Sequence, residues 1–209
     1  MMFNRIDEIV FPNRCEVIKF DNKYIYPIFK NGSSSLIIHA RQQGYKTIVN
    51  TQIKKAEIVE VILRDPLSRF LSGFNTFVYT TKRDNPHLDT DTIIYFAENY
   101  LFLNRHYAPQ LSWLLNLLRY TNENVILGLH GMEYISTLTN LNLKPGGEEQ
   151  LLHPLDIIRL KNNIHNEMYL RLDNILFNLI GQNLTFKEIL EHLKQDPIAY
   201  SKLSCIVLD

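Results

Sequence analysis

The sequence predicts an α/β fold in which a central parallel sheet is flanked by helices. Two apolar stretches rich in β-branched and aromatic residues, 23–29 and 57–63, are predicted to be buried strands. Each is followed by a polar turn and then by a segment with helical periodicity, and a third strand is expected at 124–129. Because strands that alternate with helices form parallel sheets covered on both faces, this order indicates a three-layer architecture.

The helices are predicted from their start and stop signals. The helix over 33–43 begins after Gly32 and stops at Gly44, and Asp65 is a favourable N-cap for a helix that runs to about Val78. A short strand is possible at 46–50. We expect further helices at 90–101, at 109–119, after Gly131, and over 155–179 and 184–195, which make the C-terminal part helical.

The composition is that of one soluble domain spanning residues 1–209. Apolar residues make up 45% and charged residues 21%, and 22 basic residues balance 22 acidic ones. A chain with no net charge lacks the basic face of a general nucleic-acid binder, so we expect no nucleic-acid partner.

Targeting and metal signals are not found in the sequence. The first residues carry charge and resemble no secretory signal, and no apolar run is long enough to span a bilayer, so we expect a cytoplasmic protein without a membrane span if this chain is complete. Cys15 and Cys205 have no partner at metal-ligand spacing, so no metal site is predicted.

The first candidate site is the loop Lys30-Asn31-Gly32-Ser33-Ser34-Ser35 between a strand and a helix. The start of a helix offers unpaired N–H groups and a positive dipole end, and the lysine adds a cation. The lysine precedes the only glycine, so the loop does not match the Walker pattern of nucleotide kinases. The alternative reading is a serine-capped helix after a tight turn.

The second candidate site follows the strand at 57–63. Arg64 ends that strand, and Ser72 comes eight residues later on the next helix. Ligands of open α/β sheets bind at the carboxyl ends of strands, so Arg64 should lie on the same edge as Lys30. An arginine with a nearby hydroxyl suits a second phosphate. The alternative is a structural ion pair of Arg64 with a nearby acid.

These residues resemble the sulfotransferase family that uses 3′-phosphoadenosine 5′-phosphosulfate (PAPS), and most closely its carbohydrate branch. The loop at Lys30 is similar to the family's 5′-phosphosulfate loop, although Phe29 stands where proline is usual. Arg64 and Ser72 have the spacing of its 3′-phosphate motif. The segment 104–110 is similar to an Arg-His-Trp-x-Pro-Gln element, with Tyr107 in place of tryptophan.

The resemblance implies a P-loop-like fold, PAPS as donor, adenosine 3′,5′-bisphosphate as product, and no metal. It implies that Lys30 and the loop from Asn31 to Ser35 bind the 5′-phosphate and that Lys30 also stabilises the leaving oxygen. Arg64 and Ser72 would bind the 3′-phosphate. The acceptor would be a hydroxyl of a carbohydrate or another molecule.

The transfer requires a general base, for which we favour His106. His39, Glu57 and Glu60 are weaker candidates, and a structural histidine is the alternative for His106 itself. Two other functions stay open: a P-loop nucleotide kinase, and a nucleotide-binding module without catalysis. The oligomeric state is not predicted.

Overall fold

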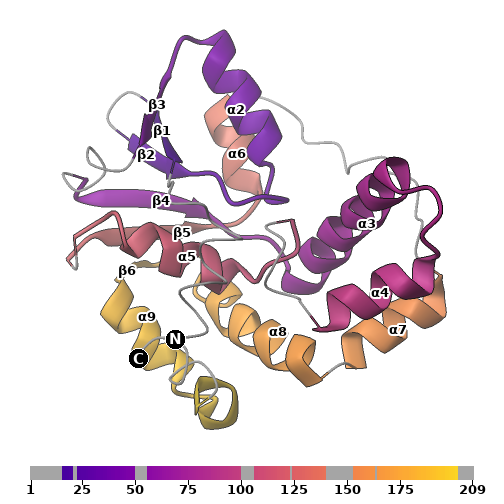
Figure 1. Ribbon diagram of the computed structural model, residues 1–209. Helices are drawn as coiled ribbons and strands as arrows, with labels where there is room; N and C mark the ends of the chain where they lie inside the picture. The colour runs from indigo at the N-terminus through magenta and orange to yellow at the C-terminus, as the bar shows by residue number, and fades with distance from the viewer. Residues whose placement is uncertain are drawn as a thin grey trace.

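Six strands form one mixed sheet in the order β3-β1-β2-β4-β5-β6 within the part of the chain that the structure describes (Figure 1). The computed structural model describes residues 16–20, 23–49, 56–99, 106–122, 124–139, 153–162 and 164–201. The strands are β1 (Glu16–Phe20), β2 (Lys23–Tyr26), β3 (Lys46–Val49), β4 (Ile58–Ile62), β5 (Ile126–His130) and β6 (Asn183–Thr185).

The predicted parallel sheet is confirmed only for its centre. Strands β2, β4 and β5 run parallel, whereas β1, β3 and β6 pair antiparallel with their neighbours. Because only two residues separate β1 from β2, the two strands can pair only as a hairpin, which is antiparallel. Strand β1 was not predicted, and β6 occupies the start of a segment predicted to be helical.

Helices α2 (Ser33–Gln42) and α6 (Glu133–Thr139) cover one face of the sheet (Figure 1). Leu36 and Ala40 of α2 and Ile135 of α6 pack with buried residues of β1, β2 and β4. This layer places the start of α2 beside the carboxyl end of β2.

Helices α5 (Gln110–Leu118), α8 (Ile164–Phe177) and α9 (Phe186–Leu193) cover the other face. Their apolar side chains pack against buried residues of the strands, including Tyr26, Val61 and Leu127. Thr185 caps α9 through a capping box with Glu188, which explains why the helix begins later than predicted. With helices on both faces, the sheet forms the middle of three layers.

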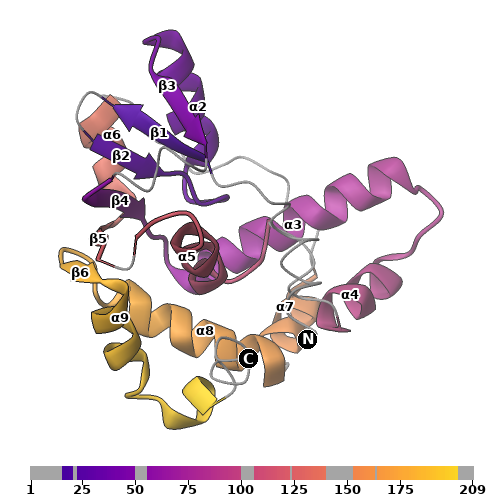
Figure 2. The same ribbon diagram turned by 60° about the vertical axis from the view of Figure 1, so that its left-hand side comes forward.

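A third apolar cluster lies to one side of the sheet (Figures 1 and 2). It joins α3 (Pro66–Asp84), α4 (Thr90–Asn99) and α7 (Pro154–Asn162). The predicted helix over 155–179 is present as the two helices α7 and α8. No helix among the described residues is both long and apolar enough to cross a membrane.

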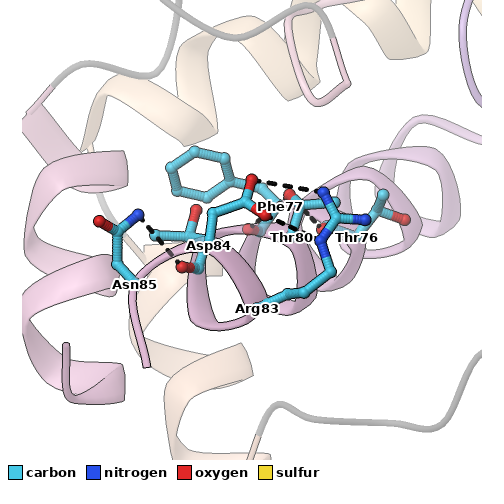
Figure 3. Close-up of polar contacts among 7 residues, drawn as sticks. Thr76, Phe77, Thr80, Arg83, Asp84 and Asn85 are labelled. Atoms are coloured by element: carbon cyan, nitrogen blue, oxygen red, sulfur yellow. Dashed lines mark hydrogen bonds and ion pairs between the residues drawn. The ribbon is translucent and has the colours of Figure 1, made fainter. Parts of the chain in front are cut away.

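Two threonine hydroxyls of helix α3 donate to backbone carbonyls of the same helix. Figure 3 shows its C-terminal half, where the Thr80 hydroxyl donates to the Thr76 carbonyl at 2.9 Å and Arg83 pairs with Asp84 at 2.8 Å. One turn earlier, the Thr76 hydroxyl donates to the carbonyl of Ser72 at 3.1 Å. Donation to a carbonyl one turn back leaves the hydroxyl oxygen able to accept.

Candidate functional site

The two predicted binding segments meet at the carboxyl ends of β2 and β4. Strand β2 ends at Tyr26, and residues 29–32 turn into α2; β4 ends at Ile62, two residues before Arg64. Since β2 and β4 are parallel neighbours, both segments lie on one edge of the sheet. One Arg64 N–H group donates to the Lys30 carbonyl at 3.0 Å, which joins them directly.

The loop has two residues in the left-handed backbone region. Gly32 has a φ of 75° and Lys30 a φ of 69°, and Lys30 is the only non-glycine residue with positive φ among those described. This conformation costs a residue with a Cβ about 1–2 kcal/mol. Such strain persists where the surroundings over-determine it, and it concentrates at functional sites.

The surroundings of Lys30 meet that condition. Arg64 holds the Lys30 carbonyl, and the Nε of Arg69 donates to the Phe29 carbonyl at 3.1 Å. Two guanidinium groups therefore fix two successive carbonyls, so the backbone around Lys30 has little freedom to relax.

The Lys30 ammonium group reaches across to α3. It donates to the Thr76 hydroxyl at 2.5 Å, and Thr76 in turn donates to the Ser72 carbonyl. Lys30 and Ser72, predicted from separate motifs, are thus connected through one residue. Ser72 is partly buried.

The serines of the loop form the first turn of α2. Ser33 is buried, Ser34 is exposed and Ser35 is partly buried. Gly32 is the N-cap, and a Cβ at that position would overlap Ile135 of α6. The loop is therefore pressed against α6 on one side and has Ser34 open on the other.

Asn31 has a different place from its neighbours. Its side chain is 1% exposed, and its Nδ2 donates to the Ile62 carbonyl at 2.7 Å and to Oε1 of Gln110 at 2.6 Å. The amide group thus points into the protein and fastens the loop to β4 and to α5. The backbone N–H of Asn31 donates to the Ile28 carbonyl at 3.1 Å, so Asn31 holds the loop in shape with both its side chain and its backbone.

Gln110, the first residue of α5, connects both predicted segments. Its Oε1 also accepts from the Arg64 N–H at 3.0 Å, and its Nε2 donates to the Arg64 carbonyl at 2.9 Å. The side chain is fully buried. Gln110 therefore contacts Arg64 and the Lys30 loop with one amide group.

Two buried charged residues, Arg69 and Asp173, lie next to Gln110 in the chain's interior. Asp173 of α8 accepts from the backbone N–H groups of Gln110 at 2.7 Å and Leu111 at 2.9 Å, at the start of α5. Arg69 donates to the Ala108 carbonyl at 2.5 Å. Arg69 is 1% exposed and Asp173 2% exposed, so both charged groups are held away from water.

Burial shifts the pKa of these groups. It lowers the pKa of Arg69 to about 10, although the charge of Asp173 opposes the shift. It raises the pKa of Asp173 to about 6, against the effects of Arg69 and of the two N–H groups. Burial also lowers the pKa of Arg64, partly offset by Asp65. The arginines stay charged at neutral pH, and Asp173 titrates near pH 6.

His106 lies next to the loop. Its ring centroid is 5.7 Å from that of Phe29, the residue before Lys30, and it is partly buried. The preceding Asn104 and Arg105 of the predicted element are outside the described residues. The position of His106 puts the favoured base on the same edge as Lys30.

The other candidate bases are placed less favourably. His39 stacks on Phe20 of β1 with ring centroids 6.0 Å apart, and Glu57 is exposed ahead of β4. The Glu60 carboxylate lies with Oε2 2.6 Å from Nε2 of His130, and the His130 ring stacks on Tyr134 of α6. Glu60 and His130 form a separate cluster on the face covered by α2 and α6.

Gly73 allows α3 to approach the His106 segment closely. A Cβ at Gly73 would overlap the carbonyl oxygen of His106 and lie 3.0 Å from the Cα of Tyr107. Both neighbours are backbone, which cannot rotate away.

Gly73→Ala should therefore destabilise the protein by about 1–3 kcal/mol, the usual cost of overpacking, despite the better helix propensity of alanine. Urea unfolding measures the change. The partly buried Ser72→Ala on the same helix should change stability by less than about 0.5 kcal/mol. A Gly73→Ala protein as stable as the wild type would contradict the close approach.

The sequence named Lys30, Arg64, Ser72 and His106 but gave no role to Thr76, Gln110 or Asp173. These three act through contacts with distant segments, which leave no local pattern. Helix α8 also carries Glu167, Arg171 and Asn174, so the sequence held no signal that singled out Asp173 as buried. Comparison with protein-family models, with curated proteins and with solved structures finds no match to this chain.

Proposed function

We propose that the protein is a sulfotransferase that moves a sulfuryl group from PAPS to an acceptor hydroxyl, and that the acceptor is a carbohydrate. The observation that carries the proposal is the left-handed Lys30, held through two carbonyls by Arg64 and Arg69 at the ends of two parallel strands. Strain kept at a cationic loop before a helix favours a phosphate ligand over a plain turn.

The donor set fits a nucleotide with two separate anionic groups. The N–H groups at the start of α2 and the Lys30 ammonium supply donors for the 5′-phosphosulfate, in the P-loop-like manner that the resemblance implies. One N–H group of the Arg64 guanidinium donates to the Lys30 carbonyl, and the guanidinium has four further N–H donors. We assign Arg64 and Ser72 together to the 3′-phosphate.

PAPS, when bound, supplies an activated sulfuryl group whose bond to the 5′-phosphate oxygen breaks as the bond to the acceptor oxygen forms. Lys30 stabilises the negative charge that grows on the leaving oxygen of adenosine 3′,5′-bisphosphate. His106 takes the proton of the acceptor hydroxyl, and the loop and Arg64 hold the reacting atoms in line.

His106→Ala should lower turnover about 100- to 10,000-fold and leave nucleotide affinity nearly intact, because the imidazole acts on the acceptor proton. Release of adenosine 3′,5′-bisphosphate from PAPS measures turnover, and calorimetry measures affinity. His39→Ala, which alters a ring stacked on β1, is the matched control and should keep full activity. Full activity in His106→Ala would remove His106 from this role.

A thermal-shift series tests the proposed ligand. A ligand that binds the folded state raises the melting temperature, so we expect the largest rise with adenosine 3′,5′-bisphosphate, a smaller one with ADP, and the smallest with ATP and magnesium. A preference for ATP with magnesium would support a kinase instead. Binding of the bisphosphate without turnover of PAPS on any candidate glycan would indicate a module without catalysis.

A further inference from the structure

We propose that Gln110 is a positioning residue that sets the spacing between the Lys30 loop and Arg64, and thereby makes the binding of two phosphates on one nucleotide cooperative. The inference rests on the proposed function, because it concerns the two groups assigned to the two phosphates. It adds the means by which the protein distinguishes a 3′-phosphorylated nucleotide from one without that group.

The hydrogen bonds of the Gln110 amide group carry the proposal. Its Oε1 accepts from Asn31 of the loop at 2.6 Å and from the Arg64 N–H at 3.0 Å, and its Nε2 donates to the Arg64 carbonyl at 2.9 Å. Arg64 is therefore held by both of its backbone groups, and the loop by the buried side chain of Asn31. The same planar amide fixes the two segments relative to each other.

Gln110 is itself held in place from α8. Asp173 accepts from the N–H groups of Gln110 and Leu111, so a carboxylate anchors the first turn of α5. Arg69 makes a second link, from the Phe29 carbonyl to the Ala108 carbonyl, between the same two regions of the chain. With its backbone anchored, the Gln110 side chain cannot follow the loop or Arg64 if either moves.

A fixed spacing affects only a ligand that uses both sites. A nucleotide with one phosphate can shift until that phosphate fits, whereas a 3′,5′-bisphosphate must satisfy both sites in one pose. Once one phosphate is bound, the second binds intramolecularly, with a gain that depends on how well the geometry matches. Loosening the spacing should reduce this gain and leave the affinity for a monophosphate less affected.

The test compares Kd for adenosine 3′,5′-bisphosphate with Kd for adenosine 5′-monophosphate by calorimetry on the full chain. Gln110→Met keeps the volume and removes the hydrogen bonds, and we expect the preference for the bisphosphate to fall about 10- to 100-fold, the effect of a misplacement of about 1 Å. Asn31→Ala removes the loop's hydrogen bonds to Gln110 and to the Ile62 carbonyl, and should lower the preference in the same direction even if Gln110→Met fails to fold.

The matched control is Asn116→Leu, which also replaces a buried amide on α5 by an apolar group. Asn116 donates to the Tyr26 hydroxyl at 3.2 Å and lies outside the network, so the preference should stay within about twofold of the wild type. An unchanged preference in Gln110→Met and Asn31→Ala would overturn the inference, and so would an equal fall in Asn116→Leu. A wild-type protein without preference for the bisphosphate would overturn the proposed function as well.

Discussion

Replacing Lys30 with glycine should lower kcat about 100- to 1000-fold while leaving the protein within about 1 kcal/mol of wild-type stability. The loss of the ammonium group removes the charge that faces the leaving oxygen in the proposed mechanism. It also removes the hydrogen bond to Thr76. Glycine offsets that loss, because it adopts the φ of 69° without the cost that a Cβ brings.

Lys30→Ala separates the two effects. It removes the same ammonium group but keeps a Cβ in the left-handed region, so it should be about as inactive as Lys30→Gly and about 1 kcal/mol less stable. Turnover of PAPS and urea unfolding measure the two quantities. If both variants kept wild-type activity, Lys30 would have no part in catalysis; equal stabilities would show that the loop relaxes once the lysine is gone.

Asp173→Asn should destabilise the protein by about 3 kcal/mol at neutral pH, the largest loss of stability that we expect from a change of so few atoms. The substitution leaves the buried Arg69 without the compensating charge. Its amide NH₂ would also face one of the two N–H groups that Asp173 now accepts from. The control is Asp65→Asn, at the exposed N-cap of α3. Asparagine caps a helix as well as aspartate does, so this variant should change stability by less than about 0.5 kcal/mol.

The effect of Asp173→Asn should depend on pH. The pKa of Asp173 is about 6 in the folded protein and 3.8 as a model value, so the folded state binds the proton more tightly. The extra stability that comes from protonation of Asp173 is complete below pH 3.8 and is lost as pH rises through about 6, while the ionised carboxylate still compensates the charge of Arg69. The difference between wild type and variant should thus grow by about 1.4 kcal/mol per unit as pH falls from 6 toward 4, and stay constant above pH 6. A pH-independent difference would contradict the raised pKa.

The centre of the fold could be predicted from the sequence because its signals are local. The runs of aromatic and β-branched residues that form β2 and β4 are followed within a few residues by helix starts at Gly32 and Asp65. The edges could not be predicted in this way. Strand β6 has three residues, and it is held by backbone pairing to β5 rather than by an alternating pattern of side chains.

In the candidate site, too, some residues could be predicted from the sequence and others could not. Lys30 and Arg64 stand at strand ends, where position along the chain indicates position in space. The contacts that hold them join residues 46 apart for Lys30 with Thr76, 79 apart for Asn31 with Gln110, and 63 apart for Gln110 with Asp173. Nothing in the composition of α5 or α8 specifies these pairs; they follow from how the helices dock.

These long separations also bear on the order of folding. Contacts that close large loops form late, because the chain entropy must be lost before the contacts compensate for it. The loop around Lys30 is complete only when α8 has brought Asp173 to the start of α5. A nascent chain that has not yet made α8 can therefore form β2 and β4 but not the fixed loop, so the proposed nucleotide binding would begin only after α8 has been made.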